Sequence, residues 1–120
     1  MKIYISHVRR GNYQEELYQP LLASELAQKH TFIFPHAVSQ KPFNTKELFQ
    51  NKGCDMVLAE ISYPATGQGI ELGWADMSGI PIVCMYKKGM DVSGSALMIA
   101  KEKVEYENTQ DLIEKLTHYV

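Results

Sequence analysis

The chain has 120 residues, 45% of them hydrophobic, and a formal net charge of −2. This length predicts one domain over residues 1–120 that can bury a substantial core. Basic residues number 12 against 14 acidic ones and form no basic stripe, and no apolar run approaches the ~18 residues of a membrane span. We therefore expect neither nucleic acid nor a membrane as a partner.

The first residues of the chain, its cysteines and its histidines bear on the cellular compartment and on metal binding. The sequence enters a strand-like segment directly at its start, which predicts that no signal peptide precedes the fold. Cys54 and Cys84 lie in or beside apolar segments without a CxxC spacing, so we expect buried free thiols and a cytoplasmic protein. The four histidines are scattered without ligand spacing, and the sequence indicates no metal site and no cofactor.

Short apolar runs alternate with longer amphipathic segments along the chain. In chain order, the sequence predicts a strand at residues 2–7, a helix at 12–30, a strand at 31–35, a helix at 44–52, a strand at 55–61, a helix at 67–78, a strand at 80–86, a helix at 95–100, a strand at 103–106 and a helix at 109–119. Pro20 should kink or split the first helix. Asn44 and Glu47 have the spacing of a capping box at the start of the second.

This alternation predicts an α/β fold, a flavodoxin-like or Rossmann-like three-layer sandwich. The usual solution at this length is a five-stranded parallel sheet of order 2-1-3-4-5. Binding sites in such folds lie outside the carboxyl ends of the strands, near the switch point between the first and third strands. Three loops meet this description, at residues 6–11, 35–43 and 62–69.

The third of these loops leads into a glycine-rich stretch, SYPATGQGIELGWA at residues 62–75. Its pattern is GxGxxxG after the third strand, which is not the dinucleotide-binding fingerprint. Gly67 and Gly69 would let a ligand approach the backbone closely. Glu71 is predicted in the first helical turn, where the helix dipole favours an ionised carboxylate. Such a carboxylate suits nucleophilic attack, although a favourable first-turn charge without chemistry explains it equally well.

At these residues the chain resembles the nucleoside 2-deoxyribosyltransferase family, and within it the short 2'-deoxynucleoside 5'-monophosphate N-glycosidases. The resemblance covers most of the chain in order and rests on the segments KIYISHVRRG, CDMVLAEISYPATGQGIELGWADMSGIPIVCMY and GSALMIA. It implies cleavage or transfer at the N-glycosidic bond of 2'-deoxynucleosides or their 5'-monophosphates. It also implies a homodimer with a shared active site.

The resemblance assigns three residues to catalysis. Glu71 matches the nucleophile that attacks C1' of the sugar and forms a covalent glycosyl-enzyme. Tyr4 matches the tyrosine that orients this carboxylate, and the alternative interpretation is a core aromatic residue. Glu47 aligns with an aspartate that acts on the departing base or the sugar, and its alternative is the capping box.

Other positions are implied in substrate binding. Arg10 and Gly11 match the loop beside the sugar-phosphate end, and Ser95 matches a serine that reaches a phosphate, often from the neighbouring subunit. A surface arginine and a helix cap are the alternatives. His36 would face the base or be an ordinary loop histidine. The remaining candidates are those of the glycine stretch: Thr66, Gly67 and Gly69.

The chain departs from the family pattern at three positions. His7 and Val8 replace a glycine and a serine of the first loop. Ala65 stands where N-glycosidases carry serine for the phosphate and transferases carry aspartate for the base. Hydrolase or transferase, base preference and the need for a 5'-phosphate therefore stay open. A non-catalytic nucleotide-binding module and a phosphoribohydrolase are the alternatives from other classes.

Overall fold

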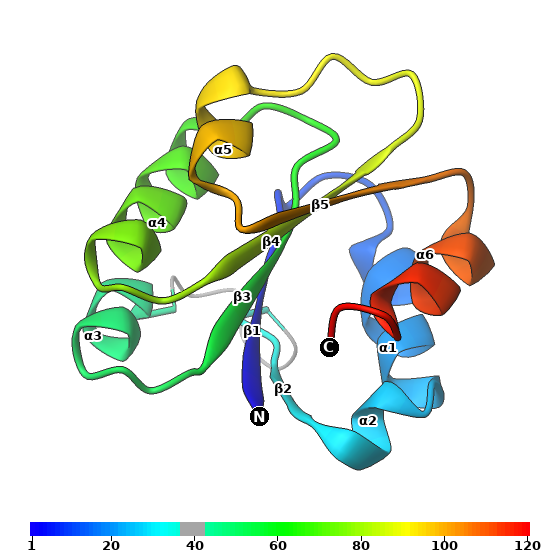
Figure 1. Ribbon diagram of the computed structural model, residues 1–120, viewed down its shortest axis with the longest axis horizontal. Helices are drawn as coiled ribbons and strands as arrows, with labels where there is room; N and C mark the ends of the chain where they lie inside the picture. The colour runs from blue at the N-terminus through cyan, green and yellow to red at the C-terminus, as the bar shows by residue number, and fades with distance from the viewer. Residues whose placement is uncertain (37–42) are drawn as a thin grey trace.

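The computed structural model describes residues 1–36 and 43–120 of the chain. Their five strands form one parallel sheet of order β2-β1-β3-β4-β5, which confirms the predicted topology (Figure 1). The strands are β1 (Lys2–Ser6), β2 (Thr31–Ile33), β3 (Met56–Glu60), β4 (Ile82–Lys87) and β5 (Glu102–Tyr106). Residues 37–42 of the predicted loop at 35–43 lie outside the described residues.

Helices cover both faces of the sheet, as a three-layer sandwich requires (Figure 1). One face carries α1 (Gln19–Ala23), α2 (Leu26–Lys29) and α6 (Thr109–Leu116), and the other carries α3 (Thr45–Gln50), α4 (Thr66–Met77) and α5 (Gly94–Ile99). Successive side chains of a strand point to opposite faces. Ile3 and Ile5 of β1 accordingly join the core beneath α1 and α6, while Tyr4 joins the core beneath α3 and α4.

The predicted helix at residues 12–30 is divided into three segments. A π-helical segment, η1 (Gln14–Tyr18), precedes α1, and α2 follows after a break at Ser24, whose backbone is extended with φ −86° and ψ 165°. Pro20 lies in the first turn of α1, where backbone N–H groups have no partner within the helix, so proline is tolerated there. The predicted split is therefore confirmed, but the chain breaks four residues after Pro20.

The capping prediction for α3 is confirmed, because Asn44 accepts a hydrogen bond from the Glu47 backbone N–H at 3.2 Å.

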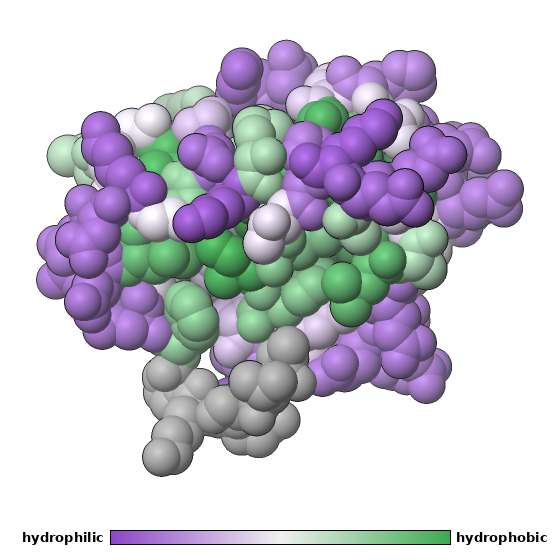
Figure 2. Space-filling view, turned by 90° about the horizontal axis from the view of Figure 1, so that it is seen from below, coloured by the Kyte–Doolittle hydropathy of each residue, from purple (hydrophilic) through white to green (hydrophobic). Residues whose placement is uncertain are grey.

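Viewed from below, hydrophilic residues cover the two sides of the molecule and hydrophobic ones gather in the middle, between the helical layers (Figure 2). Among residues 1–36 and 43–120, every helix is too short or too polar to cross a lipid bilayer.

Candidate active site

The candidate site lies at the carboxyl end of β1, where β1 pairs with β2 on one side and β3 on the other. This is the switch point at which open α/β sheets bind their ligands. Tyr4 and Ser6 lie on the same face of β1, two residues apart, and their hydroxyls reach α4. The predicted nucleophile, Glu71, lies on the side of α4 that meets them.

The Glu71 carboxylate accepts a hydrogen bond at each oxygen. The Tyr4 hydroxyl donates to Oε1, and the Ser6 hydroxyl donates to Oε2 at 3.3 Å. Thr45, the first residue of α3, has its Oγ1 3.0 Å from the Tyr4 hydroxyl. Since Tyr4 gives its proton to Glu71, Thr45 donates to the Tyr4 oxygen. Two strand residues and one helix residue thus fix the plane of a single carboxylate.

Burial sets the protonation behaviour of this cluster. Desolvation raises the pKa of Glu71 above the ordinary glutamate value, while the nearby hydroxyls of Tyr4, Thr45 and Ser6 oppose the shift. Burial, followed by the charge of Glu71, raises the pKa of Tyr4 so far that the hydroxyl keeps its proton at neutral pH. Tyr4 is therefore a permanent donor to a carboxylate that titrates closer to neutrality than an exposed one.

The predicted position of Glu71 within its helix is wrong. Helix α4 begins at Thr66 with Ala65 as its N-cap, so Glu71 falls in the second turn, and the first turn holds no acidic residue. The dipole effect is confined to the first turn, where the unpaired N–H groups point. Side-chain donors, and not the helix terminus, favour the ionised form of Glu71 here.

The glycine stretch leaves the start of α4 open. Gly67 and Gly69 are exposed, and a β-carbon at either position would meet no atom within 4 Å. Gly69, Thr66 and Ser95 line a cavity of about 540 Å³ between α4 and α5. Ser93, and not Ser95, is the N-cap of α5, because its Oγ accepts from the Ala96 N–H at 3.3 Å. The capping alternative for Ser95 is therefore wrong.

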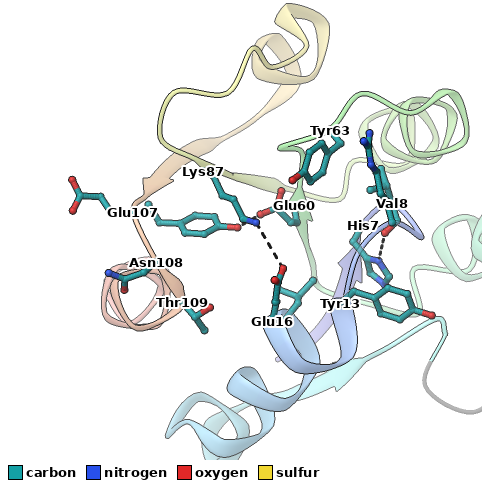
Figure 3. Close-up of a pocket in the computed structure, with 13 residues that line it drawn as sticks. His7, Val8, Tyr13, Glu16, Glu60, Tyr63, Lys87, Glu107, Asn108 and Thr109 are labelled. Atoms are coloured by element: carbon teal, nitrogen blue, oxygen red, sulfur yellow. Dashed lines mark hydrogen bonds and ion pairs between the residues drawn. The ribbon is translucent and has the colours of Figure 1, made fainter.

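A second cavity, of about 310 Å³, lies at the same edge of the sheet on the face of α1 and α6 (Figure 3). Predicted residue Arg10 lines it, with its guanidinium carbon 4.8 Å from the centre of the Tyr63 ring. Gly11 follows with φ +72°, a conformation that favours glycine. Glu71 belongs to the lining of neither cavity, whereas Tyr63 lines both. The structure thus places Arg10 near the sheet edge but not against Glu71.

Sequence reasoning missed the polar residues of this second cavity. Glu60, the last residue of β3, accepts from the Ser62 backbone N–H at 2.6 Å and from the Tyr106 hydroxyl. Lys87 lies 3.7 Å from Glu16 across the cavity (Figure 3). The signal for Glu60 was available, because it is a carboxylate at the carboxyl end of a central strand, where the switch-point rule directs attention.

His36 lies three residues beyond the end of β2, in a cluster of aromatic rings. Its ring stands 5.5 Å from that of His7, and its backbone N–H donates to the Tyr18 hydroxyl at 3.3 Å. The His7 Nδ1 donates to the Val8 carbonyl at 2.8 Å, so its Nε2 accepts from Tyr18. Burial lowers the pKa of both histidines, which are therefore neutral near pH 7. The Nδ1 of His36 is buried without a hydrogen-bond partner among the described residues.

Glu47 lies apart from the Glu71 cluster. Its side chain is exposed and accepts a hydrogen bond from Nδ2 of Asn44 at 2.7 Å. From the same helix it is Thr45, and not Glu47, that contacts Tyr4. The N-cap role of Asn44 is confirmed, but Glu47 contacts the Asn44 side chain and not the backbone N–H that would complete a capping box. The acid–base role of Glu47 stays a prediction.

Comparison with known proteins gives one curated relative and several related structures. A scan against models of protein families finds no match. A protein of Syntrophotalea carbinolica, provisionally named 2'-deoxynucleoside 5'-phosphate N-hydrolase 1, is 28% identical over 116 residues that cover 87% of this chain and 81% of the relative.

The related structures share the fold at low sequence identity. The CMP N-glycosidase of Clostridium botulinum has a TM-score of 0.71 at 17% identity, covering 99% of this chain and 100% of the other. A conserved protein of Enterococcus faecalis has a TM-score of 0.69 at 14% identity over 100% and 99%. The 2-deoxyribosyltransferase of Bacillus psychrosaccharolyticus has a TM-score of 0.61 at 20% identity over 94% and 90%. In sequence and in fold, this chain is therefore similar to enzymes of the nucleoside 2-deoxyribosyltransferase family and its N-glycosidase branch, as its motifs indicated.

Proposed function

We propose that the protein cleaves, or transfers at, the N-glycosidic bond of 2'-deoxynucleosides or their 5'-monophosphates through a covalent glycosyl-enzyme on Glu71. The observation that carries this proposal is the Glu71 carboxylate itself. It is partly buried at the switch point of the sheet, and Tyr4 and Ser6 each donate a hydrogen bond to it. A carboxylate fixed in this way is oriented for attack on an electrophilic carbon. The name of the curated relative supports the choice of bond.

The reaction has two steps. A Glu71 oxygen forms a bond to C1' while the C1'–N bond breaks, and the departing base takes the electron pair and a proton. Water, which gives up one proton to an acid–base group, or a second base then attacks C1', the ester bond breaks, and Glu71 regains its carboxylate. Tyr4 holds the carboxylate in plane throughout. Glu47 is the candidate for moving the proton, since it lies in the first turn of α3, two residues from Thr45.

The remaining site residues are assigned to substrate binding in this proposal. Arg10, Gly11 and Ser95 take the 5' end of the sugar, and a guanidinium suits a phosphate there. The open turn of Thr66, Gly67 and Gly69 admits the sugar beside Glu71. His36, whose Nδ1 is buried without a hydrogen-bond partner among the described residues, is the candidate for contact with the base. Neither a metal ion nor a cofactor is needed for this chemistry.

A homodimer with a shared active site is part of the proposal. Ile70 and Met77 of α4 and Met98 of α5 are hydrophobic side chains that are 51%, 88% and 84% exposed. A second copy that covered them would bring its own α5, and hence Ser95, close to this site. Sedimentation velocity of the wild type tests this, and a monomer at all concentrations contradicts it.

The buried thiols of Cys54 and Cys84 suit the reducing cytoplasm.

The test is release of free base from 2'-deoxy and ribo nucleosides and nucleotides, followed by chromatography with and without an added acceptor base. Free base and sugar without the acceptor indicate a hydrolase, whereas new nucleoside formed only with the acceptor indicates a transferase. Glu71→Ala should lower the rate by on the order of 10⁴-fold or more, as loss of a nucleophile does. Asp76→Ala, on the exposed side of the same helix, is the control. Equal inactivity of wild type and Glu71→Ala on every substrate contradicts the proposal and favours a binding module.

A further inference from the structure

The Ser6 hydroxyl has a second partner besides Glu71. Nε2 of Gln68 donates to Ser6 Oγ at 3.2 Å and to the backbone carbonyl of Glu60 at 2.9 Å. Both residues are buried, with Ser6 0% and Gln68 7% exposed. Gln68 is the third residue of α4 and the only buried one among the first five of that helix. It therefore ties the start of α4 to β1 and β3 at the switch point.

The direction of each hydrogen bond follows from the groups involved. Only an N–H can pair with the Glu60 carbonyl, which fixes the amide orientation of Gln68. Its nitrogen has two hydrogens and accepts none, so Ser6 must accept from Gln68. The single hydroxyl proton of Ser6 is then left for its other partner, Oε2 of Glu71, 3.3 Å away. The chain of donors runs one way, from Gln68 through Ser6 to the carboxylate.

We propose that Ser6 and Gln68 are positioning residues for Glu71, Gln68 orienting the Ser6 hydroxyl so that its proton is held on Oε2 of the nucleophile. The expected loss of kcat rests on the proposed function. The expected effect on the orientation and pKa of the Glu71 carboxylate rests on the hydrogen bonds alone. Tyr4 bonds to Oε1 and Ser6 bonds to Oε2, so the two hydroxyls together favour one orientation of the carboxylate. Neighbouring donors that polarise one another strengthen such a chain within a buried site.

The pair also contributes to how Glu71 titrates. A hydrogen bond from Ser6 favours the ionised carboxylate and opposes the effect of burial on the pKa of Glu71. The titratable groups that face Glu71 are Tyr4 from β1 and, more remotely, Tyr18 from η1. Burial raises the pKa of both, to about 12 for Tyr18, so both stay neutral across the range in which Glu71 titrates. Thr45 from α3 is uncharged. A change in the titration of Glu71 on substitution of Ser6 therefore reports the lost hydrogen bond.

The experiment compares Ser6→Ala and Gln68→Met with wild type by two readouts. Carbon-13 NMR of the glutamate carboxyls, with the Glu71 signal assigned from Glu71→Gln, follows the pKa of Glu71 without substrate. The second readout is kcat and KM for base release across pH. Both variants should raise the pKa of Glu71 and move the acid limb of kcat upward. Ser6→Ala should lower kcat roughly tenfold and Gln68→Met roughly threefold with KM unchanged, the effect of one hydrogen bond.

Ser62→Ala is the matched control, because Ser62 is also 0% exposed and its hydroxyl also makes a hydrogen bond. It accepts from the Lys87 backbone N–H at 2.9 Å and does not contact Glu71. It should leave the Glu71 signal where it is in wild type. An unchanged Glu71 pKa in Ser6→Ala overturns the inference, and a change in Ser6→Ala without one in Gln68→Met overturns the role of Gln68. If Gln68→Met does not fold, Ser6→Ala still decides. If neither wild type nor any variant releases base, the proposed function fails, while the NMR titration still tests the role of Ser6 and Gln68.

Discussion

Tyr4→Phe isolates the hydroxyl that orients Glu71. The Tyr4 side chain is 1% exposed and packs edge-on against Phe49, with ring centres 5.2 Å apart. Phenylalanine keeps this ring and its packing, so the core should remain filled. What is lost is the donor to Glu71 and the acceptor for Thr45.

The magnitude follows from the charge state of the partner. A hydrogen bond to a charged group contributes about 1.5–3 kcal/mol, and a neutral one about 0.5–1.5 kcal/mol. Above the pKa of Glu71 the variant loses one bond of each kind, so unfolding should require roughly 2–4.5 kcal/mol less free energy. Below that pKa Glu71 is neutral, and the loss falls to that of neutral hydrogen bonds. The hydrogen bond from Tyr4 to ionised Glu71 alone corresponds to a factor of roughly 10–150 in the ionisation equilibrium of Glu71. The rate on the acid limb of the pH profile should change by the same factor.

Urea unfolding of wild type and Tyr4→Phe at two pH values, one at about pH 4, below the ordinary glutamate pKa, and one alkaline, measures this difference. The stability gap should widen as the pH rises through the pKa of Glu71, and the acid limb of kcat/KM should move to higher pH. A gap that is the same at both pH values, with an unmoved limb, would refute the reasoning. Tyr4 would then be a core aromatic residue only.

Three further predictions concern stability. Because burial raises the pKa of Glu71 above its unfolded value, ionisation of Glu71 destabilises the fold progressively as the pH rises from the ordinary glutamate pKa through the raised one. Glu71→Gln should therefore abolish base release yet raise the melting temperature at alkaline pH, and the gain should vanish once the pH falls below the ordinary glutamate pKa. Phe49→Ala, at a site that is 0% exposed, should cost about 3–5 kcal/mol in urea unfolding, against a clearly smaller loss for Phe43→Ala, which is 40% exposed. Asn44→Ala removes the N-cap of α3 and should cost about 0.5–2 kcal/mol by the same measurement, and an unchanged midpoint would contradict the capping role.

The order of strands and helices could be predicted because its signals are local. Apolar runs and amphipathic periods are properties of neighbouring residues, and the parallel sheet of order 2-1-3-4-5 follows from their alternation. The capping of α3 by Asn44 has the same origin, since the cap and its partner are three residues apart. The start of α4 was misplaced because Ala65 gives no side-chain cap to mark it.

The site could be predicted in part, through motifs at the ends of the strands. Glu71 and Tyr4 were expected together, and the structure brings them into contact although they are 67 positions apart. Ser6, Thr45 and Gln68 were not expected, because a hydroxyl or an amide beside an apolar run carries no pattern of its own. Their roles depend on which side chains the packing of α3 and α4 against β1 brings within hydrogen-bonding distance.

The sequence by itself thus determined the layers, the strand order and the edge of the sheet where chemistry is expected. Only the tertiary structure decided which groups shift the pKa of the carboxylate at that edge. Helix position suggested that Glu71 is held ionised by a nearby N-terminus, whereas burial raises its pKa and three side-chain hydroxyls oppose the shift. Desolvation and long-range hydrogen bonds depend on atoms that meet only after folding, and no local pattern of residues encodes them.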